Sequence, residues 1–149
     1  MKKFQFSLER MLNFQQQNLQ KEKNLMGQMI EEKLGYEQQR ERMTSQLEQI
    51  HAGMDEEIRK GTTIFQIRAF TTMIENGKLQ LEGIRRKISI VDAEIERQRQ
   101  VVVEASREVS KLEKLRDKKL EEYRYAEAKE QENTVSEHVS GKFVRQSVS

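Results

Sequence analysis

The sequence predicts an all-α protein, a long two-helix antiparallel coiled-coil hairpin with a C-terminal helical overhang. Apolar residues recur at alternating spacings of three and four along most of the chain. A repeat averaging about 3.5 residues keeps one stripe of a helix facing a partner helix, and we call this stripe the seam. The seam is interrupted once, at Lys60-Gly61-Thr62-Thr63, and the 149 residues include no proline, which would break a helix interior.

The first helix is expected over residues 7–59, after a short basic and aromatic arm at residues 1–6. Ser7 is the expected N-cap, and Phe6 and Met11 have the spacing of a hydrophobic staple. The apolar seam positions of this helix are Leu8, Leu12, Leu19, Met26, Met29, Tyr36, Met43, Leu47, Ile50 and Met54, with Gln15, Glu22, Lys33 and Arg40 as polar positions between them.

Residues 60–63 are the expected turn, and the second helix is expected over residues 64–132. Gly61 can adopt the left-handed conformation that ends a helix. Thr63 and Gln66 have the spacing of a capping box, and so short a connection makes the two helices antiparallel. Fourteen of the eighteen seam positions downstream are apolar: Ile67, Phe70, Ile74, Ile84, Leu81, Ile88, Val91, Ile95, Val102, Ala105, Val109, Leu112, Tyr123 and Ala126, the exceptions being Gly77, Gln98, Arg116 and Lys119.

The antiparallel register can be predicted, because a hairpin centred near Gly61 pairs residues whose numbers add up to about 120–124. Leu12 then meets Val109, and Glu22 meets Gln98 in a polar layer that would help to fix the register. Apolar residues meet apolar residues in this register, which favours a monomeric hairpin over a homodimer. A parallel homodimer built on the second helix stays open as an alternative.

The second helix is predicted to extend beyond the first. Residues from about 118 to 132 would form a single-helix overhang, which we expect to be frayed without a partner, and residues 133–149 a flexible tail. Gly77 occupies a seam position, so it is expected to leave the seam locally empty and weakly packed.

Composition argues against catalysis. Charged residues make up 35% of the chain and hydrophobic residues 35%, which suits a narrow seam inside a solvated surface rather than a large core. The two histidines are far apart, and we find no metal-binding, phosphate-binding or nucleophile motif. We therefore expect no enzyme, no catalytic, cofactor or metal residues and no small-molecule substrate. The net charge of +2 is spread among interleaved acids and bases, so nucleic acid is not an expected partner.

The chain resembles the FliJ family of flagellar type III export proteins. The resemblance rests on the opening Lys3-Phe4-Gln5-Phe6-Ser7-Leu8-Glu9-Arg10-Met11-Leu12, on Gly61, Ile67, Phe70, Met73 and Ile74 after the break, and on Lys111-Leu112-Glu113-Lys114-Leu115. Length and two-helix layout are similar too, so the resemblance covers nearly the whole chain. The acidic C-terminal signature of the family is reduced here to residues 128–133.

The resemblance implies a soluble coiled-coil component of the flagellar type III protein export apparatus, a regulator of the export ATPase needed for flagellum biogenesis and motility. It implies a central stalk that inserts into the hexameric export ATPase, stimulates it, contacts the large membrane protein of the export gate and binds export chaperones. The implied location is cytoplasmic, peripherally associated with the inner face of the cell membrane at the flagellar base.

By family position, two sets of binding residues are implied. The ATPase-binding set is Phe4, Phe6, Leu8, Leu12, Leu112, Lys114, Leu115 and Tyr123. The set that binds the export gate is Gln39, Met43, Gln46, Ile50, Met73, Gly77, Gln80 and Ile84. Alternatives that stay open are a coiled-coil scaffold, an escort chaperone for secreted flagellar subunits, and the equivalent stalk of an injectisome.

Overall fold

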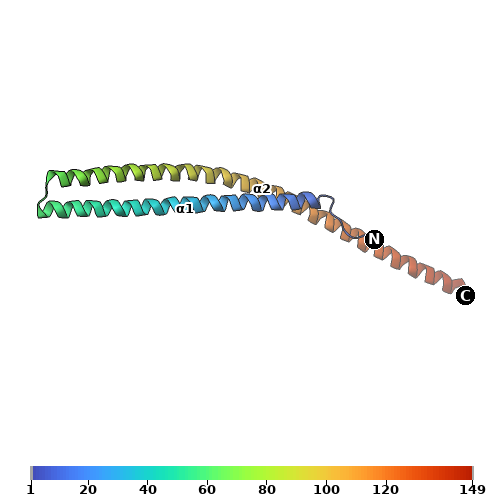
Figure 1. The fold of residues 1–149 in the computed structure, drawn as a ribbon. Helices are drawn as coiled ribbons and strands as arrows, with labels where there is room; N and C mark the ends of the chain where they lie inside the picture. Colours follow the sequence, from blue (N-terminus) through green and yellow to red (C-terminus); the bar gives the residue numbers. More distant parts are fainter. Residues whose placement is uncertain (1, 149) are drawn as a thin grey trace. The chain divides into compact units, whose positions relative to one another are not determined.

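The computed structural model describes residues 2–148 and contains two helices joined by a short turn (Figure 1). Helix α1 spans Glu9–Lys60 and helix α2 spans Ile64–Val148, and no strand occurs within the described residues. The predicted all-α fold with two long packed helices is confirmed. The chain divides into two compact units, residues 21–102 and residues 1–20 with 103–149, which we describe in turn.

The turn between the helices has the predicted chemistry. Gly61 has a φ of 90°, the left-handed conformation that favours glycine, and its N–H donates a 3.2 Å hydrogen bond to the Ile58 carbonyl. The Gln66 N–H donates to the Thr63 hydroxyl at 3.3 Å, which is one half of the predicted capping box. The Gln66 side chain does not complete the box, because its amide oxygen accepts a hydrogen bond from the Thr62 hydroxyl instead.

The unit of residues 21–102 contains the antiparallel seam on both sides of this turn. The Gln98 side chain donates to Glu22, and a methyl group at Gly77 would meet Leu47. The numbers 22 and 98 add to 120, and 47 and 77 add to 124, so the predicted register is confirmed in this unit. The buried residues of the unit are Leu47, Ile74, Leu81, Ile88, Val91, Ile95 and Gln98.

The unit that contains both chain ends has its own apolar cluster. Leu12, Val109 and Leu112 are buried, and Leu8 and Leu19 pack against them. This cluster confirms the predicted approach of Leu12 to Val109. Beyond it, Arg116 forms a 3.2 Å ion pair with Glu9 in the first turn of α1.

The first turn of α1 differs from the prediction. The first helical hydrogen bond runs from the Leu12 N–H to the Leu8 carbonyl at 2.9 Å, so the helix begins at Glu9. The Glu9 N–H donates to the Phe6 carbonyl at 3.1 Å, which closes a turn through the expected N-cap, Ser7. Phe6 is buried, but Met11 is 51% exposed, so the predicted staple between them is wrong.

Helix α2 continues to Val148, through residues where the sequence predicts a flexible tail. No proline interrupts the helix, and residues 128–147 are exposed. A helical stretch without tertiary contacts is marginal in water. The flexibility of this stretch in solution therefore stays a prediction. The predicted boundaries of the arm, the helices, the turn, the overhang and the tail stay predictions as well. No helix within residues 2–148 combines the length and apolar character needed to cross a membrane.

Candidate functional site

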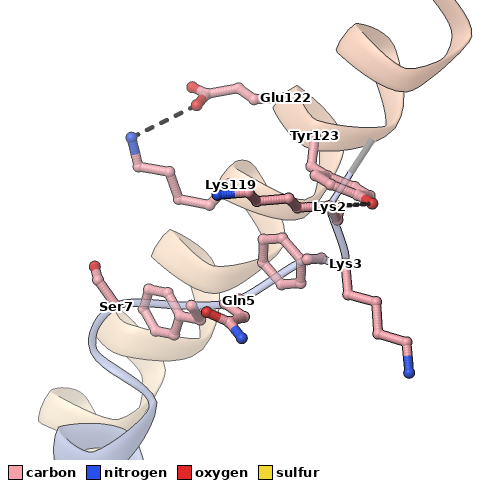
Figure 2. A pocket seen from close by; sticks show the side chains of 9 residues that line it. Lys2, Lys3, Gln5, Ser7, Lys119, Glu122 and Tyr123 are labelled. Carbon is pink, nitrogen blue, oxygen red and sulfur yellow. Dashed lines mark hydrogen bonds and ion pairs between the residues drawn. The ribbon is translucent and has the colours of Figure 1, made fainter.

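The arm folds back onto α2 instead of extending into solvent (Figure 2). The rings of Phe4 and Tyr123 lie with centroids 5.5 Å apart and planes tilted by 55°. The Tyr123 hydroxyl donates a hydrogen bond to the main-chain carbonyl of Lys2. Tilted aromatic pairs of this kind contribute about 0.5–1.5 kcal/mol beyond their buried area. The arm is therefore held at two points, by a hydrogen bond at Lys2 and by an aromatic contact at Phe4.

Two open cavities flank the arm. One of about 640 Å³ lies between the arm and α2 and is lined by Lys2, Lys3, Phe4, Gln5, Phe6, Ser7, Lys119, Glu122 and Tyr123 (Figure 2). A second, of about 590 Å³, is lined by Phe4, Gln5, Phe6, Ser7, Glu9, Arg10 and Arg116. Aromatic rings and basic side chains dominate both linings. We call the set Lys2, Lys3, Phe4, Arg10, Lys119 and Tyr123 the terminal surface.

Charge on the terminal surface is only partly balanced. Glu122 pairs with Lys119 at 3.5 Å, and Glu9 pairs with Arg116. Within the described part of the chain, Lys2, Lys3 and Arg10 make no ion pair and are exposed. Burial raises the pKa of the Tyr123 phenol, and the neighbouring Glu127 carboxylate adds to the rise. Tyr123 therefore stays neutral, and able to donate its hydrogen bond, throughout the physiological range.

The structure separates the predicted ATPase-binding residues into two groups. Phe6, Leu12 and Leu112 are buried, and Leu8 packs on the apolar cluster, so these four support the fold. Those with accessible surface are Phe4, Lys114, Leu115 and Tyr123. Phe4 and Tyr123 are brought into contact, whereas Lys114 lines neither of the two cavities beside the arm.

Sequence reasoning did not include Lys2, Lys3, Arg10 and Lys119 among the site residues. A signal was present, because Arg116 and Lys119 are polar residues at seam positions. They become polar where the partner of α2 changes from helix α1 to the arm and to the acidic Glu9. A seam position that is polar near the end of a helix can therefore indicate a change of partner.

The residues predicted to face the export gate all lie in the unit of residues 21–102. They form one stripe on each helix, spaced by four, three and four residues. Met73 is 48% exposed, and Gln39, Gln46 and Gln80 are exposed as well, while Met43, Ile50 and Ile84 are half-buried. Gly77 is buried, so it offers a partner no surface.

The expectation that Gly77 leaves the seam empty is wrong. A Cβ atom at this position would lie 2.5 Å from Cδ2 and 3.1 Å from Cγ of Leu47. Leu47 is only 8% exposed, so its side chain occupies the space over the glycine backbone. The Leu47 side chain approaches more closely and fills the space that a side chain at residue 77 would occupy.

A comparison with protein families decides the identity of the chain. The family model described as Flagellar FliJ protein matches residues 4–147, from Phe4 in the arm almost to the end of α2. The chain belongs to the FliJ family. Together with the two packed helices, this membership makes the chain a coiled-coil protein related to flagellar export. Neither the comparison with curated proteins nor that with solved structures yields a match.

For the FliJ family member described here, the match includes the arm from Phe4 onward and the α2 segment on which the arm lies. Within residues 2–148, no group of three or more His, Cys, Asp or Glu side chains is placed to hold a metal ion. The terminal surface offers aromatic rings that can pack against another molecule and ammonium groups that can pair with carboxylates.

Proposed function

We propose that this FliJ family protein is the central stalk of the flagellar export ATPase. The unit with both chain ends inserts into the hexameric ring, stimulates assembly and hydrolysis, and the protein links the ring to the membrane export gate. The observation that carries the proposal is the terminal surface, which concentrates accessible aromatic and basic side chains where the N-terminal arm lies on α2. Family membership supplies the flagellar export setting.

The chemistry of those predicted ATPase-binding residues that have accessible surface supports binding inside a ring. A central partner cannot match six equivalent subunits at once, so its contacts must be modest and adaptable. Phe4, Leu115 and Tyr123 are partly exposed apolar or aromatic groups, and Lys114 is an exposed charge. Such mixed contacts favour binding to one or two subunits at a time.

The proposed contact with the export gate uses the stripes in the unit of residues 21–102. Met73 offers a flexible, half-exposed thioether side chain, which adapts to partner surfaces. Gln39, Gln46 and Gln80 supply hydrogen-bonding groups around it. The protein acts in the cytoplasm in this proposal, at the inner face of the membrane and next to the gate.

The experiment that tests the stalk is a titration of the full-length protein into the cognate export ATPase, with hydrolysis rate and ring formation measured together. Stimulation should fall strongly for the double variant Lys114→Ala/Leu115→Ala. A matched control is Lys78→Ala/Leu79→Ala, which removes the same pair of side-chain types from exposed positions in the other unit. Unchanged hydrolysis and assembly at saturating wild-type protein would refute the stalk.

A second candidate function, escort of secreted subunits or their chaperones, is favoured by one observation. Val135, Val139 and Phe143 follow one another at intervals of four on α2, and all are more than half exposed. An apolar stripe on a helix can dock into the groove of a helical partner. Replacing all three by serine should abolish chaperone binding in this function and leave ATPase stimulation unchanged.

A further inference from the structure

We propose that the terminal surface receives an acidic segment of the partner protein. Its carboxylates would pair with Lys2, Lys3 and Arg10, and an apolar side chain of the segment would pack beside the Phe4–Tyr123 pair. This inference rests on the proposed function, whose ATPase it takes as the partner, and it names the chemistry by which that partner is recognised.

The charges around the arm favour an acidic partner. The acidic groups that line the two cavities, Glu9 and Glu122, are each occupied by a basic residue of α2. Lys2, Lys3 and Arg10 have no acidic partner within residues 2–148. Three unbalanced positive charges therefore lie within the first ten residues of a chain whose total charge is only +2. A positive patch of this kind steers the encounter with a negative one and fixes its register.

The two cavities give the segment a place to bind. They lie on either side of Phe4 and Phe6, with volumes of about 640 and 590 Å³. Lys2 and Lys3 line the first, and Arg10 lines the second. Carboxylates on both sides of an apolar residue would therefore reach cations on both sides of the arm. Aromatic groups with a polar edge, such as Tyr123, are frequent anchors in protein interfaces.

The surroundings favour a short acidic peptide over a nucleic acid or an anionic membrane. Beyond Tyr123, α2 carries four acidic residues interleaved with four basic ones, so no continuous row of cations extends along it: Glu127, Glu130, Glu132 and Glu137 against Arg124, Lys129, Lys142 and Arg145. An extended polyanion binds by placing phosphates along a continuous row of cations, and these carboxylates would repel it. A segment of a few residues can occupy the cavities beside the arm without reaching the carboxylates of α2 beyond Tyr123.

The arm also places the cations in a defined position, which distinguishes them from mobile terminal lysines. The Tyr123 hydroxyl is bound to the carbonyl of Lys2, and the neighbouring ring of Phe4 packs on the same tyrosine. Figure 2 shows Lys2 and Lys3 on this anchored segment, pointing in different directions from it. Anchoring reduces the conformational entropy lost when a carboxylate binds.

The test measures binding of the full-length protein to the cognate export ATPase at low and high salt. The charge-reversal variant is Lys2→Glu/Lys3→Glu/Arg10→Glu. Its matched control, Arg68→Glu/Lys78→Glu/Arg85→Glu, makes the same change in net charge at exposed positions of the other unit. We expect the first variant to lose about tenfold or more in affinity at low salt, the control less than about threefold, and the difference to shrink at high salt.

The possible outcomes separate the inference from the function on which it rests. Equal affinity of the two variants, with wild-type binding intact, would overturn the acidic segment and leave the stalk standing. Absence of wild-type binding would refute the stalk. Binding to phosphatidylglycerol vesicles or to duplex DNA, tighter than to the ATPase and lost in the first variant, would assign the surface to a different class of partner. Circular dichroism verifies that both variants keep their helices.

Discussion

Leu47 lies over Gly77 so closely that a methyl group on residue 77 would come within 2.5 Å of its Cδ2 atom. The two residues belong to opposite helices of the unit of residues 21–102. A glycine in a helix interior costs about 1 kcal/mol relative to alanine. Here the cost is offset, because the bare backbone lets a leucine side chain reach a depth at which it is almost fully buried.

The first prediction concerns this contact. Gly77→Ala should lower the free energy of unfolding by about 1 kcal/mol, since overpacking a buried site costs about 1–3 kcal/mol and the gain in helix propensity returns about 1. In the Gly77→Ala background, Leu47→Ala should cost less than in the wild type, because it removes the clash. Urea denaturation of the four proteins gives this coupling energy.

A matched control is Gly35→Ala in α1, where an added Cβ meets no atom within 4 Å. That substitution should stabilise the protein by up to about 1 kcal/mol. If Gly77→Ala stabilises the protein as much as Gly35→Ala does, the close contact with Leu47 does not exist in solution.

The second prediction concerns the polar layer. The buried Gln98 side chain donates at 2.6 Å to the Glu22 carboxylate and at 3.0 Å to its carbonyl. Gln98→Leu should raise the free energy of unfolding by about 1 kcal/mol, because it replaces a polar seam residue with an apolar one while the half-exposed Glu22 can turn to water. It should also relax the register, because leucine fits every apolar layer equally well.

Register can be measured with spin labels, since the chain has no cysteine of its own. Labels at Gln39→Cys and Gln80→Cys, both exposed in the same unit, should give one narrow distance distribution in the wild type. Gln98→Leu should add a second population, displaced along the helix by one heptad, about 10 Å. A single unchanged distribution would show that the apolar layers alone fix the register.

The sequence predicts the contacts that follow from the repeating seam, and it does not predict the contacts that no repeat sets. The pairing of Glu22 with Gln98 followed from seam period and turn position, because both act locally and repeat along the chain. The contact of Leu47 with Gly77 was missed. The seam pattern shows that residue 77 has no side chain, but it does not show which neighbouring side chain fills the space. The return of the arm onto Tyr123 was missed as well, since no repeat covers residues 2–6 and their contacts are set by two aromatic rings.

The third prediction is that the arm orders α2 next to it. Phe4→Ala removes the aromatic contact, so amide hydrogen exchange of residues 119–127 should accelerate about tenfold. Tyr123→Phe keeps the ring and removes only the hydrogen bond to Lys2, so the acceleration should be about threefold. The matched control is Tyr125→Ala, whose ring is 70% exposed, and it should change exchange much less. Equal effects of Phe4→Ala and Tyr125→Ala would mean that the arm does not hold α2.

The fourth prediction follows from the pKa of Tyr123, which burial and the nearby Glu127 raise above the ordinary phenol value of 10.0. A group whose folded-state pKa is raised contributes stability below its unfolded pKa and loses it as the pH rises through the folded one. The arm should thus stay docked up to about pH 10 and detach above it, when the phenolate can no longer donate to the Lys2 carbonyl. The ring signals of Phe4 in an NMR titration should report the detachment, together with tyrosinate absorbance. In Tyr123→Phe the same signals should not follow this titration, and an identical pH response in that variant would place the cause elsewhere.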